Sequence, residues 1–212
     1  MKLTSFRVRR YKNVLDSTAV SVDPEVTVLV GMNESGKSAM LDALYRLNPV
    51  YDDSFSERDD YPRWRWKRDG RKEELSAVSP IEATFELDEN DQECLRSVLG
   101  EGVVDTNSLT VGRSYNGRLW VRIPVDEQRF LRNVLDGHPN ADLLLGEHKT
   151  VASLKKSLSV ESGSTIDPAT SDESSKETDR GAAVLARIKD LIGEEEDLSV
   201  IVQEVVTDRM PK

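Results

Sequence analysis

Eight residues from Gly31 to Ser38 combine two glycines, a lysine and a serine at the spacing G-x-x-x-x-G-K-S. Glycines let the backbone curl so that successive N–H groups point at phosphate oxygens, and Lys37 adds a positive charge that reaches the β- and γ-phosphates. The Ser38 hydroxyl can ligate the Mg²⁺ that bridges those phosphates. The pattern predicts a site for a nucleoside triphosphate with Mg²⁺; a glycine-rich turn that binds nothing is the alternative. The predicted phosphate-binding residues are Gly31, Asn33, Glu34, Ser35, Gly36, Lys37 and Ser38.

The elements on either side of this loop have the order that such a site needs. Val26–Val30 is a short, β-branched apolar run that predicts a buried parallel strand ending at Gly31. After Lys37, apolar residues recur at three- and four-residue spacings, which predicts a helix that ends near Asn48-Pro49. Those apolar residues are Met40, Leu41, Ala43, Leu44 and Leu47. Strand, loop and helix together predict a P-loop fold.

The loop also carries a family resemblance. Gly31–Ser38, followed by Leu41-Asp42-Ala43-Leu44, resembles the G-x-N-E-S-G-K-S…L-x-A-L segment of ATPase heads grouped with RecF, SMC proteins and the overcoming-lysogenisation-defect (OLD) nucleases. The chain start, residues 2–14, is similar to their first strand and the turn that follows it. The resemblance implies ATP and Mg²⁺ as cofactors and places Arg10, Tyr11, Lys12 and Asn13 beside the adenine. By composition alone, the same residues fit a polar turn between strands equally well.

The resemblance further implies parts that we do not find in the sequence. Such heads need a signature segment, a strand that ends in Asp-Glu for Mg²⁺ and the attacking water, and a switch histidine; the catalytic residues are therefore unknown. We interpret the chain as an amino-terminal piece of a head that acts as a dimer. The implied partners are a second ATPase head, DNA, and an effector nuclease or another protein.

Composition favours a soluble intracellular domain. The 212 residues are 37% hydrophobic, enough for a core, and no apolar run approaches the length of a membrane span. One cysteine, Cys94, cannot form an internal disulfide, so we expect a cytoplasmic protein without membrane contact. The formal net charge of −10 argues against a surface that binds nucleic acid everywhere.

One local basic patch could contact DNA or a partner. It interleaves tryptophans with cations, a mixture suited to neutralising phosphates and stacking on bases. Its candidate contact residues are Arg63, Trp64, Arg65, Trp66, Lys67 and Arg68. Because the tryptophans alternate with cations at strand period, we favour a strand whose indoles pack inward, and keep the DNA contact as the alternative.

The remaining pattern predicts an antiparallel sheet, then helices. Strands are expected over 80–87, 109–115 and 119–123, with a hairpin at Asn116-Gly117 and a helix from Asp88–Asp91 to Leu99. The predicted fold class is an α/β P-loop NTPase (ABC-ATPase-like) lobe with an antiparallel sheet and a helical carboxy-terminal hairpin. We expect the lobe over residues 1–150, a flexible Ser/Thr/Asp/Glu-rich linker over 151–181 and a helical arm or hairpin over 182–212.

Two functional hypotheses follow. The first is an ATP-binding lobe of a RecF/SMC/OLD-like ATPase that acts in DNA repair or defence against phage and hydrolyses ATP only within a complete dimeric head. The second is a non-catalytic nucleotide-binding module that docks a partner protein. The two differ in whether ATP is turned over.

Overall fold

A computed structural model describes residues 1–51, 53–136, 141, 145–146, 149–154, 156, 202–203 and 206–207. The chain divides into two compact units. The first, the sheet unit, comprises Met1–Gln92, Thr106–Ile123 and Val205–Lys212; the second unit comprises Glu93–Asp105 and Pro124–Glu204. No helix among the described residues is both long and apolar enough to cross a bilayer.

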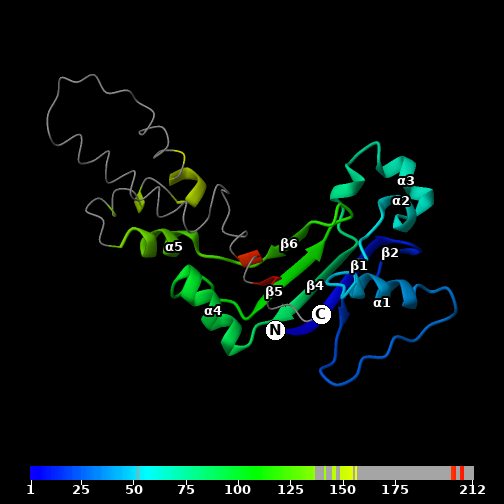
Figure 1. Cartoon of the computed structure of the whole chain (residues 1–212), viewed down its shortest axis with the longest axis horizontal. Coiled ribbons are helices and arrows are strands. Elements are labelled where there is room, and N and C mark those ends of the chain that lie inside the picture. The colour runs from blue at the N-terminus through cyan, green and yellow to red at the C-terminus, as the bar shows by residue number, and fades with distance from the viewer. Residues whose placement is uncertain are drawn as a thin grey trace. The chain divides into compact units, whose positions relative to one another are not determined.

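The sheet unit is built on an antiparallel sheet. Its strands are β1 (Lys2–Tyr11), β2 (Val14–Asp16), β3 (Val20–Ser21), β4 (Ile81–Glu86), β5 (Ser108–Arg113) and β6 (Leu119–Arg122). The order is β2-β1-β4-β5-β6, with β3 also paired to β1, and every pairing is antiparallel. Figure 1 shows β4 between β1 and β5. This arrangement confirms the predicted mixed α/β class with an antiparallel sheet.

Strand alternation places the core on one face of this sheet. Val8 pairs with Ile81, and Ala83 pairs with Phe6 on one side and Val111 on the other; all five side chains are buried. Neighbouring apolar side chains on the same face bury each other, which is the main stabilising unit of such a sheet. The predicted Asn116-Gly117 hairpin joins β5 to β6, with Gly117 at φ +81°.

The helices are α1 (Lys37–Tyr45), α2 (Glu57–Asp60), α3 (Arg63–Asp69), the 3₁₀ turn η1 (Leu75–Ala77), α4 (Glu89–Leu99) and α5 (Glu127–Val134). The helix predicted after the glycine-rich loop is α1. Its buried face is formed by Ala39, Ala43 and the following Leu47. The Arg113 guanidinium of β5 donates a hydrogen bond to the Leu47 carbonyl at 2.8 Å, which ties the end of the helix to the sheet.

The strand predicted over Val26–Val30 does not form. The segment between β3 and α1 is a wide loop (Figure 1), and Val26, Val28 and Val30 have exposed fractions of 71%, 72% and 89%. A β-branched run forms a buried strand only where neighbouring strands and covering side chains are available. No described segment of the chain pairs with it, so the prediction of a buried strand is wrong for this chain.

The second unit contains α5, which Asp126 caps by accepting a hydrogen bond from the Arg129 N–H. Residues 151–154, at the start of the predicted linker, are helical, and Val151 and Leu154 are buried. The rest of the predicted linker lies outside the described residues, apart from residue 156. So does the predicted helical arm, apart from residues 202–203 and 206–207, which are helical.

Candidate nucleotide-binding site

The glycine-rich loop closes around the ammonium group of Lys37. Lys37 Nζ donates hydrogen bonds to the carbonyls of Gly31 at 2.8 Å and Met32 at 2.7 Å, and lies 3.4 Å from Ser35 Oγ. The Ser35 N–H donates to the Met32 carbonyl at 3.3 Å. These contacts fold residues 31–37 into a ring that holds the positive charge of Lys37 within the loop.

Helix α1 begins directly at this ring. Its N-cap is Gly36, which supplies no side-chain cap, and the first turn carries no acidic residue. The first helical hydrogen bond runs from Met40 N–H to the Gly36 carbonyl at 2.9 Å. The N–H groups of Lys37, Ser38 and Ala39 therefore have no partner within the helix and point out of its positive end. Such an end attracts an anion.

A side chain would be crowded at both glycines, and Gly36 is also required by its backbone conformation. A Cβ on Gly31 would lie 2.9 Å from Ser35 Oγ, inside the ring. Gly36 has φ +95°, and a Cβ there would lie 2.7 Å from Val14 Cγ2. Glu34, at φ +64°, also occupies the left-handed region. A loop held in this conformation is consistent with a phosphate cradle.

The chemistry of this donor set fits a triphosphate with Mg²⁺. Backbone N–H groups, the helix end and Lys37 supply positive potential. The exposed Ser38 lies at the second position of α1, and its hydroxyl oxygen is a suitable ligand for Mg²⁺. Among the predicted residues, Asn33 and Glu34 are exposed on the outer part of the loop.

The turn after β1 packs beside this loop. Asn13 Nδ2 donates a hydrogen bond to the Glu34 carbonyl at 2.7 Å, and its side chain lies 3.5 Å from the position of a Cβ on Gly36. Arg10 and Lys12 are both in the left-handed region, at φ +51° and +49°. The structure thus brings the two predicted groups of site residues together.

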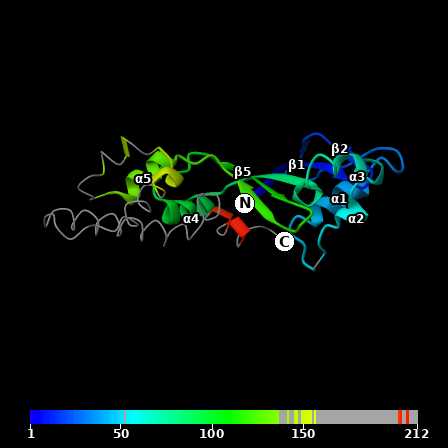
Figure 2. The same ribbon diagram turned by 90° about the horizontal axis from the view of Figure 1, so that it is seen from above.

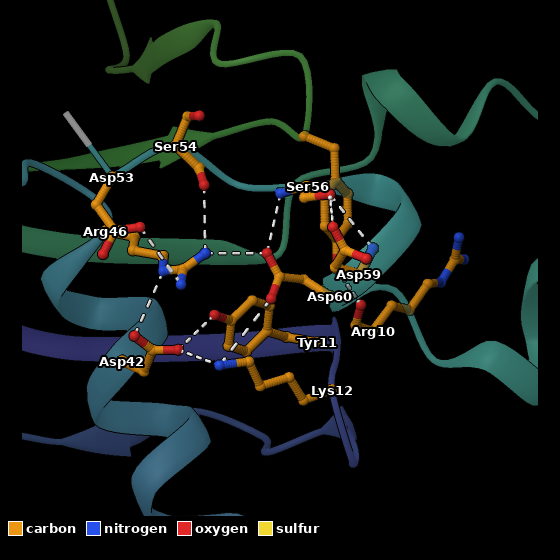
Figure 3. A network of polar contacts seen from close by, with 11 residues as sticks. Arg10, Tyr11, Lys12, Asp42, Arg46, Asp53, Ser54, Ser56, Asp59 and Asp60 are labelled. Atoms are coloured by element: carbon orange, nitrogen blue, oxygen red, sulfur yellow. Dashed lines mark hydrogen bonds and ion pairs between the residues drawn. The ribbon is translucent and has the colours of Figure 1, made fainter.

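Asp42 of α1 holds this turn in place (Figure 3). The Tyr11 hydroxyl donates to Asp42 Oδ2 at 2.6 Å, and the Lys12 ammonium binds the same oxygen. Burial would raise the pKa of Asp42, but the hydrogen bonds from Lys12 and Tyr11 outweigh it and hold that pKa below its ordinary value. Burial and the bond to Asp42 raise the pKa of Tyr11.

Arg46, one turn further along α1, connects Asp42 to the segment before α2. Its guanidinium lies 3.4 Å from Asp42 Oδ1 and donates to Asp60 Oδ2 at 2.9 Å and to the Ser54 carbonyl at 3.2 Å. The buried Asp60 carboxylate also accepts the Ser56 N–H at 2.9 Å. The Asp60 carbonyl accepts the Lys12 N–H at 2.6 Å. Figure 3 shows this network spanning α1, the turn and α2.

Tyr11 corrects one expectation. The resemblance places it beside the adenine, but its side chain is fully buried and packs edge-on against Phe55, with ring centroids 5.5 Å apart. An aromatic ring without exposed surface cannot stack on a base, so Tyr11 belongs to the core beneath the turn. Arg10 forms an ion pair with Glu73, and its carbonyl accepts the Tyr115 hydroxyl at 2.6 Å. Lys12 and Asn13 are exposed.

The basic patch forms a helix, which corrects the favoured strand. It is α3, whose first turn is closed by hydrogen bonds from Arg65 and Trp66 N–H to the Pro62 carbonyl. The exposed fractions are 67% for Trp64 and 41% for Trp66, so the indoles do not pack inward. Proline before the first helical residue and the Arg65–Asp69 pair at four-residue spacing favour the helix.

The cations of α3 have different environments. Arg65 and Arg68 pair with the buried Asp69 at 3.1 and 3.2 Å, while Arg63 and Lys67 are exposed on its surface. Lys67 and Trp66 also line a pocket of about 530 Å³ in the sheet unit. In Figure 2, α3 lies close to α2. Only part of the predicted patch is therefore available to a ligand.

Sequence reasoning missed the polar network behind the site. Arg46 and Asp60 carry no recognisable motif, although the four-residue spacing of Asp42 and Arg46 on a predicted helix is a usable signal. Asp42 itself lies in the Leu41–Leu44 segment that carries the resemblance.

Comparison with known proteins agrees with the loop geometry. Residues 1–95 match the model of a family described as "AAA ATPase domain". The match supports an AAA-type ATPase part in the amino-terminal region of the chain. The match covers all the residues of the glycine-rich loop, the turn, α1 and α3, and it supports an ATP-binding ATPase lobe that contains these elements.

One similar solved structure comes from work on "ATP-driven dimerization and DNA stimulated activation of SMC ATPases". It is 13% identical, the alignment covers 86% of this chain and 99% of that chain, and the TM-score is 0.32. Because this TM-score is low, the interpretation of the site rests on the family match and on the loop geometry. No curated protein matches the sequence.

Proposed function

We propose that the chain is the Mg-ATP-binding lobe of a RecF/SMC/OLD-like ATPase that works on DNA in the cytoplasm, in repair or in defence against phage. It hydrolyses ATP only as part of a complete dimeric head. The observation that carries the proposal is the ring formed by Lys37 and the carbonyls of Gly31 and Met32 at the uncapped start of α1. The lobe places positive potential and a hydroxyl at one point, which suits a nucleotide triphosphate and Mg²⁺.

In this site the groups have distinct roles. The loop N–H groups and the α1 start bind and orient the phosphates, and Lys37 turns from the loop carbonyls to the phosphate oxygens. Ser38 would hold Mg²⁺, which supplies charge neutralisation at the β- and γ-phosphates when bound. No residue of this site is assigned a catalytic role.

The exposed Val26, Val28 and Val30 support a lobe that other strands complete. These three alternate residues each have an exposed fraction of at least 71%. Long exposed apolar runs in folded proteins mark surfaces that another segment covers. The same surface also fits the second candidate function, a nucleotide-binding module that docks a partner protein.

The DNA part of the proposal rests on α3. Exposed indoles beside exposed cations bind single-stranded nucleic acid by stacking and phosphate neutralisation. Replacing Lys67 and Arg63 by glutamate is expected to weaken binding of an oligonucleotide and to flatten its dependence on salt. The control is the pair Arg118→Glu and Arg132→Glu, which reverses two exposed cations outside α3. An unchanged salt slope in the Arg63/Lys67 variant would remove α3 from the proposal.

The two candidate functions are separated by steady-state ATP hydrolysis over a wide range of protein concentration, with Lys37→Ala as the blank. The lobe alone is expected to show no ATP turnover above the blank. Adding a polypeptide that carries the completing parts, the signature segment and the strand ending in Asp-Glu, is expected to produce turnover. Turnover by this chain alone that rises faster than linearly with concentration and disappears in Lys37→Ala would show a self-sufficient dimeric ATPase. Persistent inactivity with the completing parts present would favour the docking module.

A further inference from the structure

We infer that Asn13 is a positioning residue for the phosphate loop and does not contact the nucleotide base. The inference rests on the proposed function, since it concerns the loop that binds the triphosphate. In this inference the turn after β1 holds the backbone of the loop. Contact with the adenine alone would not require that role.

The contact that carries this inference joins a side chain to a strained peptide. Asn13 Nδ2 donates to the Glu34 carbonyl at 2.7 Å, and Glu34 has φ +64°, a conformation that a non-glycine residue adopts only when its surroundings impose it. The peptide between Glu34 and Ser35 is planar and trans, so its C=O and N–H point in opposite directions. Holding the carbonyl toward Asn13 therefore turns the Ser35 N–H to the inner side of the ring.

That inner N–H is one of the donors a phosphate requires. Without ligand it donates to the Met32 carbonyl at 3.3 Å, a long bond that an anionic oxygen can replace. Asn13 Oδ1 also lies 3.5 Å from the place a Cβ would take on Gly36, so its amide lies beside the last residue before α1.

Asn13 is itself held by its neighbours in the turn. The Lys12 N–H donates to the Asp60 carbonyl, and the Lys12 ammonium binds Asp42. The Tyr11 hydroxyl donates to Asp42, and the Tyr11 ring packs against Phe55. Asp42 belongs to α1, the helix that starts at the loop. Figure 3 shows Asp42 joining this helix to Tyr11 and Lys12 of the turn. A side chain on such a support can hold its target at a fixed distance.

The test compares two ligands that share phosphates but differ in the base. Wild type, Asn13→Ala and Asn13→Asp are titrated by calorimetry with Mg-ATP and with Mg-tripolyphosphate, and Asn90→Ala, on the exposed surface of α4, is the control. Aspartate matches asparagine in shape but cannot donate a hydrogen bond. We expect Asn13→Ala to lose about fivefold in affinity for both ligands, the value of one hydrogen bond, with an unchanged ratio of the two dissociation constants. Asn13→Asp should lose more than Asn13→Ala for both ligands, because its negative charge also repels the phosphates.

Hydrogen exchange at the Ser35 amide gives a second readout. It is expected to become faster in both Asn13 variants while the Ala43 amide, within α1, stays as protected as in wild type. A loss confined to Mg-ATP would overturn the inference, because it would show that Asn13 contacts the base. Unchanged affinity for both ligands would overturn it as well. If wild type binds neither ligand, the proposed function fails and takes the inference with it.

Discussion

At the scale of single residues, the site depends on backbone conformations that side chains enforce. Glu34 and Gly36 lie in the left-handed region on either side of Ser35, and Asn13 and Val14 pack against them. The loop therefore holds its phosphate-binding shape through contacts with a segment some twenty residues earlier in the chain, and not by its glycines alone.

Gly36→Ala tests this dependence. The new Cβ would sit 2.7 Å from Val14 Cγ2 at φ +95°, so we expect a loss of about 1–3 kcal/mol in stability and a fall in Mg-ATP affinity. Gly117→Ala is the matched control, because Gly117 has φ +81° but nothing within 4 Å of the added Cβ. Urea unfolding and ATP titration of both variants would contradict the account if they showed equal losses.

Asp42→Asn tests the network behind the loop. Because the folded-state pKa of Asp42 lies below its ordinary value of 3.8, its carboxylate contributes stability above that pH, and the contribution is lost as pH falls through the folded-state pKa. Wild type is expected to be more stable than Asp42→Asn at pH 7, with the difference shrinking below about pH 4. Urea unfolding at pH 7 and pH 3 measures it; a difference that is independent of pH would contradict the role of the charge.

At the scale of elements, the sequence predicts what depends on neighbours in the chain. The loop, α1 and the β5–β6 hairpin follow from glycine placement, helical spacing and Asn116-Gly117, which act locally, and all three are present. Whether Val26–Val30 forms a strand depends on partner strands from elsewhere in the structure. The helical conformation of α3 depends on its contacts with Pro62 and Asp69 more than on its alternating sequence pattern. The polar network of Asp42, Arg46 and Asp60 joins two separate segments, so the four-residue spacing of Asp42 and Arg46 reveals only the part within one of them.

The exposure of Val26–Val30 makes a sharp prediction. Val28→Ala is expected to change the free energy of unfolding by less than about 0.5 kcal/mol, because the side chain is 72% exposed. Val8→Ala in β1 is the matched control; Val8 is fully buried, and the change should cost about 2 kcal/mol. Thermal and urea unfolding measure both. A similar cost at both positions would show that another segment covers Val28 in the folded protein.

At the scale of the whole molecule, the sheet unit combines a phosphate loop with an antiparallel sheet, and hydrogen bonds from Asn13 and Arg113 connect the two. Residues 1–95, which match an AAA ATPase domain, contain the loop, the turn, α1 and α3. The second unit, with α5, contributes none of the residues assigned to the nucleotide. We therefore expect nucleotide binding to be a property of the sheet unit.

The measurement that tests the central claim most directly is a calorimetric titration of the full chain with Mg-ATP, with Lys37→Ala as the test variant and Lys72→Ala as the control. Lys72 is an exposed lysine outside the loop. We expect wild type and Lys72→Ala to bind with the same affinity, and Lys37→Ala to bind about ten- to a hundredfold more weakly, the value of a charged hydrogen bond to phosphate. Equal binding by Lys37→Ala and wild type would contradict the assignment of the nucleotide site to Gly31–Ser38.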